Sequence, residues 1–412
     1  MTENVRVTAS RDGWAGTRSA AQARLAEFMP EAPQYSSRRN FALPGNHGVS
    51  RLSPYLRHRL ISEEEVITQV TSSHEIELVE KFIQEVVWRT YWKGALARTP
   101  EAWSSYEQLV ATLPHNTMAK PWSDLYRTAT EGKTHLPYFN DWVHELTSTG
   151  YLHNHIRMWF ASIWIFTFKI PWQLGAAFMY EHLLDGDPAS NTLSWRWVAG
   201  LHTKGKTYLA RADNIAKYSE GRWTPRESEL APEPFTIQDD TAPAPYETLS
   251  LPTVSPSDTA CLVMTTDDLS IETVLHLERY SAAVLYHPQV PSLTPLKRSF
   301  IEQGIADTVT RLRALLGNES VATVSSPSEA IEWIAKQNAN ATEIVAPHIG
   351  PLSGPTRELA LALTETQHPV SLMQRSWDLN LFPLCDKGFF PMWERFKKRW
   401  AARGLLSGTT IG

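Results

Sequence analysis

The stretch that decides the fold is TGYLHNHIRMWFASIWIFTFKIPWQLGAAFMYEHLLDGDPASNTLSWRW, residues 149–197. It is apolar and aromatic for almost its whole length, yet five polar residues interrupt it: Asn154, Arg157, Asp185, Asp187 and Asn191. Burying polar groups among apolar side chains costs free energy unless each group finds a partner. The pattern therefore predicts a helical core that holds a large, flat, partly polar ligand.

Composition narrows the class of protein. The 412 residues carry a net charge of −5 and are 42% apolar, which suits a globular chain of two or three domains and gives no whole-chain sign of nucleic-acid binding. The two cysteines exclude a disulfide framework and a four-cysteine iron–sulfur cluster within this chain, and they favour a reducing, cytoplasmic location. No signal peptide is expected from residues 1–13, and the apolar run 158–170 is too short to span a membrane.

Tryptophan is unusually frequent. Of the 16 tryptophans, 12 fall between Trp14 and Trp223 and four follow. From composition alone, this density favours a tryptophan-rich helical core over the alternative, an aromatic ligand site or an electron-transfer path.

Apolar spacing divides the chain into three parts. Residues 1–225 show helical periodicity, residues 226–258 have the Pro, Ser, Thr and acidic content of a linker, and from residue 259 apolar runs alternate with helical segments. This alternation predicts a doubly wound parallel sheet in residues 259–412. Helices are expected at 17–28, 73–96, 137–146, 154–168, 174–184, 296–316, 327–337, 356–363 and 391–402, and a further helix is expected to begin at a Ser62–Glu65 capping box. A loop is expected at 35–53. Strands are expected at 261–264, 282–286, 321–324, 343–346 and 370–373.

Three local constellations carry possible chemistry. The hydroxyls of Ser50 and Ser53 precede a helix and suit either a phosphate or a simple cap. Glu85 shares a helical face with Trp88, which would raise the pKa of the carboxyl by desolvation; a surface Glu–Arg pair is the alternative. A buried Arg157 needs an anionic partner, for which Asp185 or Asp187 is the candidate. The Asp-Gly-Asp start resembles a calcium loop, but no further ligands follow, so no metal site is expected.

Four segments in order resemble the signatures of the DNA photolyase and cryptochrome family. They are S-R-L-S-P-Y-L at 50–56, E-x-x-W-R at 85–89, T-G-Y-x-H-N-x-x-R-M at 149–158, and D-G-D-x-A-x-N-x-x-x-W-x-W at 185–197. The resemblance implies an all-helical photolyase-type domain that binds FAD, followed by a Rossmann-like antenna domain. Usual members place these two domains in the opposite order, so a permutation is expected, and whether a second antenna chromophore binds is left open.

The resemblance also implies roles for individual residues. Those on the FAD side are Tyr35, Ser50, Leu52 and Ser53 at the phosphates, Arg157, Asp185 and Asp187 at the flavin ring or ribityl chain, and Asn191 facing flavin N5. Those on the substrate side are Glu85, which would hydrogen-bond a pyrimidine dimer, Trp88 and Trp197, which would wall it, and Arg39, Asn154 and Met158 as further contacts. Trp195 and Trp172 match the inner and middle members of an electron-transfer chain, with Trp122 and Tyr126 as candidates for the outer member.

Three functions are compatible with this resemblance. The first is light-driven repair of cyclobutane pyrimidine dimers in DNA, by electron transfer from photoexcited reduced FAD in a monomeric enzyme with no membrane attachment. The second is a cryptochrome-like blue-light photoreceptor, which His155 favours because repairing members often have Arg there. The third is a flavoprotein with no light role. DNA would lie in a basic groove formed by Arg39, Arg51, Arg57, Arg59, Arg196 and Lys204.

Overall fold

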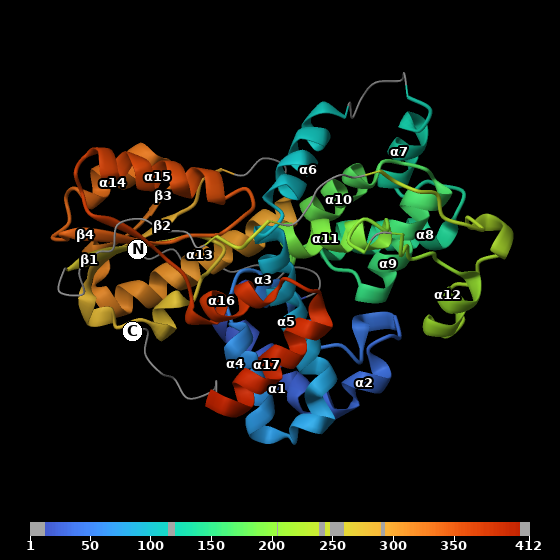
Figure 1. Ribbon diagram of the computed structural model, residues 1–412, viewed down its shortest axis with the longest axis horizontal. Helices are drawn as coiled ribbons and strands as arrows, with labels where there is room; N and C mark the ends of the chain where they lie inside the picture. Colours follow the sequence, from blue (N-terminus) through green and yellow to red (C-terminus); the bar gives the residue numbers. More distant parts are fainter. Residues whose placement is uncertain are drawn as a thin grey trace, which may run out of the picture.

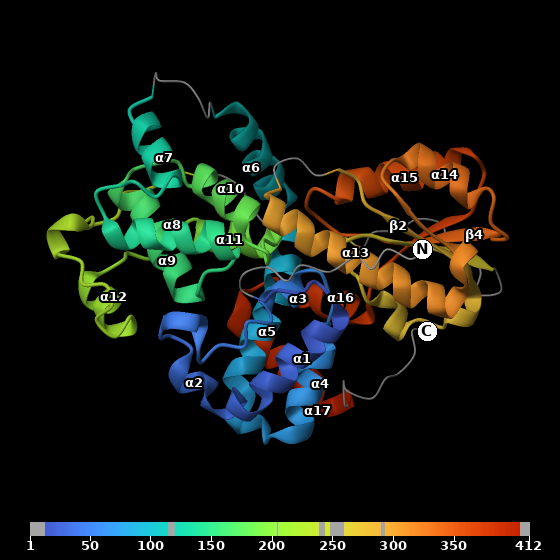
Figure 2. The same ribbon diagram turned by 180° about the vertical axis from the view of Figure 1, so that it is seen from behind.

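The computed structural model describes residues 13–113, 120–203, 205–238, 244–247, 259–289 and 293–403, with side chains through residue 400. Figure 1 shows a helical part on one side and an α/β part on the other, and Figure 2 shows the same division from behind. Of the predicted linker at 226–258, residues 239–243 and 248–258 lie outside the described residues, as does Lys204.

The helical part is organised around the long helix α5. The predicted capping box is confirmed at the start of α4. The Ser62 side chain accepts from the Glu65 backbone N–H, and the Glu65 side chain accepts from the Ser62 backbone N–H. Gly150 ends α8 at a φ of 69°, a conformation that costs glycine nothing. The helices are α1 (Arg18–Phe28), α2 (Tyr35–Arg38), α3 (Ser53–Arg57), α4 (Glu63–Ser73), α5 (Ile76–Ala97), α6 (Pro100–Thr112), α7 (Ser123–Thr130), α8 (Pro137–Thr149), α9 (Asn154–Ser162), α10 (Trp172–His182), α11 (Pro188–Val198) and α12 (Ala212–Tyr218).

Local structure departs from the sequence prediction at several points. The expected loop at 35–53 contains α2 and a 3-10 turn, and the expected helix at 154–168 ends as a π-helix over Ile163–Thr167, where the backbone N–H of Phe168 reaches the carbonyl of Ile163. Helices α6, α7, α11 and α12 were not predicted. In α11 the start signal was present, because Asp187 caps it and Pro188 occupies its first position.

The α/β part confirms the doubly wound parallel sheet. All its strand pairs are parallel, in the order β3-β2-β1-β4-β5. Cys261 and Val263 of β1 pack toward α14 and α15, whereas Leu262 and Met264 pack toward α13 on the opposite face. The elements are β1 (Ala260–Met264), β2 (Tyr280–Tyr286), α13 (Pro295–Leu316), β3 (Val321–Val324), α14 (Pro327–Ile334), β4 (Ala341–Val345), α15 (Ser353–Glu365) and β5 (Val370–Met373).

The C-terminal helices leave the sheet and return to α5. Helix α16 (Ser376–Leu381) and helix α17 (Phe389–Arg403) lie beside α5 in both views. Trp377 of α16 donates its indole N–H to Thr90 of α5 at 2.9 Å. A side chain at Gly94 would place its Cβ 2.6 Å from the sulfur of Cys385, so the packing is close. By contact these helices belong with the helical part, and the domain boundaries 1–225, 226–258 and 259–412 remain a proposal.

Within the described ranges, no helix is both long enough and apolar enough to cross a membrane. The same ranges contain no group of three or more His, Cys, Asp or Glu side chains placed to hold a metal ion.

Candidate functional site

A cavity of about 540 Å³ lies where α5, α9, α10 and α11 meet. This volume falls in the usual range for small-molecule and cofactor sites. It brings together most of the residues predicted for both the flavin and the substrate: Arg39, Ser53, Glu85, Trp88, Asn154, Arg157, Met158, Asp185, Asp187, Asn191, Trp195 and Trp197. The predicted residues Tyr35, Ser50, Leu52 and Trp172 do not line it.

The predicted pairing of Arg157 is present on the cavity wall. Its guanidinium Nη2 donates to Asp185 Oδ2 at 2.8 Å, and its Nε donates to the carbonyl of Leu152 at 2.9 Å. Burial acts to lower the pKa of Arg157, but the Asp185 carboxylate raises it above its ordinary value. The ion pair therefore places a fixed dipole in the cavity wall, within a segment that is otherwise apolar.

The other carboxylate oxygen of Asp185 has no partner. Asp185 Oδ1 is buried and accepts no hydrogen bond from any described residue. Leaving such an acceptor unsatisfied is costly, so its position in a cavity wall indicates a ligand that donates a hydrogen bond. A flavin ring N–H or a ribityl hydroxyl is such a donor, and the residues present fit FAD in this respect.

Asp187 has a structural role in addition to lining the cavity. Its Oδ1 accepts from the backbone N–H groups of Ala189 and Ser190 at 2.9 and 2.8 Å, which caps α11. Burial acts to raise the pKa of Asp187, but the cations Arg89 and Arg57 lower it below its ordinary value. The carboxylate is therefore already engaged, and its predicted ribityl or ring role would have to share it with these partners.

Asn191 is held in one orientation. Its side-chain N–H donates to the carbonyl of Ala176 on α10 at 2.8 Å. The amide oxygen of this cavity-lining side chain is thereby left available as an acceptor. An amide cannot deliver a proton as a carboxylic acid can, so this position can accept a hydrogen bond from a ring N–H without protonating the ring.

Glu85 lies in a more polar setting than the sequence suggested. Arg39 forms a close ion pair with its carboxylate, and Lys81, one turn earlier on α5, lies 3.3 Å from the same oxygen. The alternative of an i,i+4 pair with Arg89 is wrong, because Arg89 pairs with Glu63 and Asp187. Glu85 is thus held at the cavity wall by two cations and not isolated beside an indole.

One predicted substrate wall is already covered. The ring of Phe389, at the start of α17, stacks on Trp88 with centroids 3.8 Å apart and planes 7° apart. Trp92 contacts Trp88 as well, at 5.1 Å. The second predicted wall, Trp197, packs against Tyr208 at 5.7 Å and remains partly exposed in the cavity.

Three residues predicted at the phosphates lie beside the cavity. Tyr35 packs its ring against Phe28 and Phe82, and burial raises its pKa well above the ordinary value. Leu52 is a core residue, and the hydroxyl of Ser50 accepts a long hydrogen bond from its backbone at 3.4 Å. Of the four predicted phosphate contacts, only Ser53 lines the cavity, because the others serve local packing.

Of the two tryptophans predicted for electron transfer, Trp195 lines the cavity and Trp172 does not. The ring centroid of Trp195 lies 6.3 Å from that of Trp164. Trp164 contacts Tyr126 at 5.8 Å, and Tyr126 contacts Trp122 at 6.3 Å. Trp172 instead stacks on Tyr106 at 5.8 Å. A series of neighbouring rings therefore leads from the cavity through Trp164 to Tyr126 and Trp122, the two candidates for the outer member.

His155 does not reach the cavity. Its Nδ1 lies 2.8 Å from the carbonyl of Asn40, and its ring stacks on Trp159 with centroids 4.6 Å apart. Burial lowers its pKa below the ordinary value. This residue is a core histidine, so it does not decide between repair and signalling by contact with a substrate.

The predicted basic groove is largely wrong. Arg57, Arg59 and Arg196 are buried. Arg57 donates to Asp267 at 2.6 Å and to the carbonyl of Gly186 at 3.0 Å. Because Gly186 lies in the cavity loop, the segment between α10 and α11, Arg57 joins this loop to the α/β part. Arg57 and Arg59 thus pair with the distant carboxylates of Asp267 and Asp378, and neither guanidinium faces solvent.

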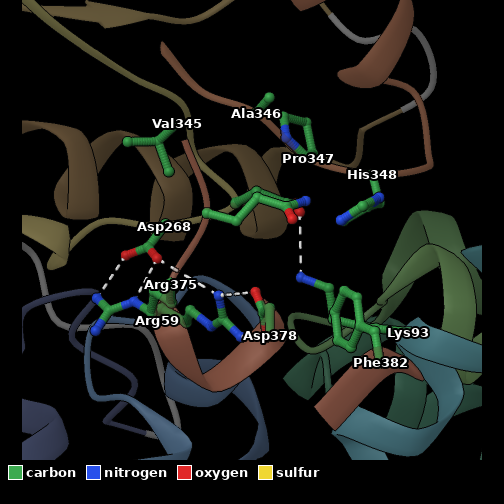
Figure 3. A pocket seen from close by; sticks show the side chains of 12 residues that line it. Arg59, Lys93, Asp268, Val345, Ala346, Pro347, His348, Arg375, Asp378 and Phe382 are labelled. Atoms are coloured by element: carbon green, nitrogen blue, oxygen red, sulfur yellow. Dashed lines mark hydrogen bonds and ion pairs between the residues drawn. The ribbon is translucent and has the colours of Figure 1, made fainter. Parts of the chain in front are cut away.

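The same ion pairs fill the ligand crevice of the sheet. In doubly wound folds, ligands bind at the carboxyl ends of the strands where the strand order reverses, here between β1 and β4. Figure 3 shows that Arg59, Arg375 and Asp378 occupy this place, with Asp268 bridging the two arginines. The remaining space is about 20 Å³, so it does not fit an antenna chromophore.

Sequence reasoning missed several cavity residues. Phe390 of α17 and Lys81 of α5 line the cavity, and Phe389 covers Trp88. The segment that carries the phenylalanines, DKGFFPMWERFKKRW, has an evident helical apolar face, but only tertiary packing brings it to α5.

Comparison with known proteins agrees with this geometry. Residues 82–222 match the family described as FAD binding domain of DNA photolyase. The deoxyribodipyrimidine photo-lyase of Vibrio cholerae is 29% identical over 203 residues, covering 48% of this chain and 42% of that protein. The enzyme of the same name from Streptomyces griseus is 30% identical over 195 residues, covering 44% and 40%. The chain thus spans less than half the length of these curated relatives.

Among solved structures, a bacterial class III photolyase from Agrobacterium tumefaciens aligns with a TM-score of 0.43 and 25% identity, covering 52% of this chain and 47% of that one.

Proposed function

This chain belongs to the DNA photolyase and cryptochrome family, with FAD as its cofactor, and from that premise we propose that it is a light-driven lyase that splits pyrimidine dimers in DNA. The observation that carries the proposal is the single cavity that joins the two sets of predicted residues. The cavity is lined by Arg157, Asp185 and Asn191, which are expected on the flavin side, and by Glu85 and Trp197, which are expected on the substrate side. A cofactor and a flipped-out lesion would therefore meet in one enclosed space.

The residues of this chain would position the two reactants. When bound, reduced FAD would supply, under blue light, the electron that opens the cyclobutane ring, and it would regain that electron once the ring has split. Asp185 Oδ1 and the amide oxygen of Asn191 offer acceptors that orient the flavin. Glu85, fixed by Arg39, offers a carboxyl to the pyrimidine edge.

The decisive experiment measures repair of defined lesions. Purified, photoreduced protein is illuminated with blue light in the presence of oligonucleotides that contain either a cyclobutane dimer or a (6-4) product. We expect repair of the cyclobutane dimer under light and none in the dark, and a strong loss in Glu85→Ala. Failure of the flavin-loaded wild type to repair the cyclobutane dimer would refute the proposal.

One observation favours a second function, that of a cryptochrome-like photoreceptor. Phe389 already occupies a face of Trp88, which reduces the surface left for a lesion. A receptor would use the same flavin and tryptophans and would show a light-dependent conformational change without repair. Limited proteolysis in light and dark, run on the same preparation as the repair assay, separates the two functions.

Oligomeric state, cellular location and chromophore content follow from the same proposal. We expect a monomer in a reducing, cytoplasmic location, because both cysteines, Cys261 and Cys385, are buried and unpaired. We expect no antenna chromophore in the crevice of the sheet, since ion pairs fill it. The absorption spectrum of the purified protein would then show flavin bands alone.

A further inference from the structure

Phe390 has an unusual position. It lies in the first turn of α17, and its side chain lines the flavin cavity although the residue is 66% exposed. Single exposed apolar residues are common on protein surfaces and need no explanation. Phe390 differs because it stands at the mouth of a cavity that holds the predicted substrate residues.

The backbone under Phe390 is firmly held. Phe389 stacks on Trp88 with ring planes 7° apart, and its ring is nearly parallel to that of Trp393, with planes 11° apart and centroids 6.4 Å apart. Trp393 donates its indole N–H to Glu80 of α5 at 3.3 Å. The Phe390 ring, 5.6 Å from that of Phe389, is thus presented by an anchored helix start. A ring on such a support loses little conformational entropy when a ligand stacks on it.

The wall of the cavity that Phe390 lines carries a positive excess. Arg39 and Lys81 line the same cavity, and both pair with the single carboxylate of Glu85. Two cations against one anion leave a net positive charge. A flat apolar face beside such a charge matches a nucleobase that is attached to a phosphate backbone.

We propose that Phe390 is a stacking platform for a nucleobase that flanks the dimer in bound DNA, an inference that rests on the function proposed above. Extruding a lesion leaves its neighbouring bases without a stacking partner. An aromatic ring at the cavity mouth restores that stacking for one of them. The contact is contributed by the C-terminal helix, outside the four sequence signatures of the flavin domain.

The test is DNA affinity in the dark. Fluorescence anisotropy with a labelled duplex that contains one cyclobutane dimer compares wild type, Phe390→Ala and Phe390→Trp. We expect a Kd roughly 5- to 100-fold higher for Phe390→Ala, the range for loss of one base–aromatic stack, and a Kd near wild type for Phe390→Trp. Leu361→Ala, which removes a 53%-exposed side chain from α15, is the matched control and should bind as wild type does.

Salt dependence separates stacking from charge. Phe390 neutralises no phosphate, so Phe390→Ala should keep the wild-type slope of log Kd against log salt, whereas Lys81→Ala should flatten it. Flavin absorbance verifies that each variant is folded and loaded. A Phe390→Ala Kd within twofold of wild type would overturn this inference and leave the proposed function standing. If the wild type does not prefer damaged DNA, the proposed function fails and this inference falls with it.

Discussion

The Arg157–Asp185 pair provides the sharpest test of the flavin site. Asp185 has a side chain only 3% exposed, whereas that of Arg157 is 23% exposed. Replacing Arg157 by Met leaves a buried carboxylate without its cation, which costs about 3–5 kcal/mol for a fully buried pair. Because Arg157 is partly exposed, we expect about 2–3 kcal/mol here. Asp185→Asn leaves a mostly buried guanidinium with a neutral partner, at about 1–2 kcal/mol.

The double variant turns these losses into a measurement of coupling. Arg157→Met with Asp185→Asn removes both charges, so its loss of stability should be smaller than the sum of the single losses by about 1–3 kcal/mol. Urea unfolding of the apoprotein, followed by circular dichroism, gives the three free energies. Additivity within about 0.5 kcal/mol would refute the claim that the pair is a buried, interacting unit.

Flavin affinity should not recover in the double variant. The double variant no longer has an unpaired buried charge, but it has also lost the anionic acceptor Asp185 Oδ1 that faces the cavity. We therefore expect the Kd for FAD, measured by flavin fluorescence quenching, to rise at least about tenfold in Asp185→Asn and in the double variant, as for loss of a hydrogen bond to a charged group. Wild-type affinity in the double variant would show that this carboxylate does not contact the flavin.

Three further changes test the surroundings of the site. Burial lowers the pKa of His58 to about 3, below its value of about 6.5 in the unfolded chain, so the contribution of neutral His58 to folding is complete above about pH 6.5 and about 2 kcal/mol of it is lost by pH 5. The variant His58→Gln should remove that part of the pH dependence of the free energy of unfolding in urea. An unchanged pH dependence would contradict this prediction. Gly175→Ala would drive a Cβ into the ring of Trp195 and should destabilise by about 1–3 kcal/mol, seen as a lower Tm; an unchanged Tm would show that the ring can move aside. Trp164→Phe should slow light-driven flavin reduction, followed by the loss of oxidised-flavin absorbance, more than Trp172→Phe does, and the opposite ranking would restore the route predicted from sequence.

The sheet was predictable because its signal is local. Apolar runs bounded by turns identify five strands within about two residues, since strands covered on both faces need nearly continuous apolar residues. Helix ends were less accessible. The predicted helix from residue 73 in fact begins at Ile76, because α4 continues to Ser73 and the extended His74 ends it. The π-helix before Phe168 depends on packing and has no local sequence signal.

The site was predicted where local motifs and tertiary contacts agree. Arg157 and Asp185 are 28 residues apart, but α9 and the turn between α10 and α11 bring them together as the resemblance implied. Arg57 and Arg59 were misread because their partners, Asp267 in the α/β part and Asp378 in α16, lie more than 200 residues away. Spacing along the chain cannot reveal such partners, so a basic stretch was interpreted as a surface groove.

Segments that lie far apart in the sequence line one cavity, which is compatible with the proposed exchange of domain order. The helical part supplies the flavin wall, and α17 returns past the sheet to stack Phe389 on Trp88. Exchanging the order of two parts requires only that a linker span the ends, which adds little closure entropy even when the linker is long. The contacts between the parts are what must be kept, and Arg57 keeps them by joining Gly186 of the cavity loop to Asp267 after β1. The α/β part therefore supports the flavin cavity through ion pairs, in the same crevice where other doubly wound domains bind a ligand.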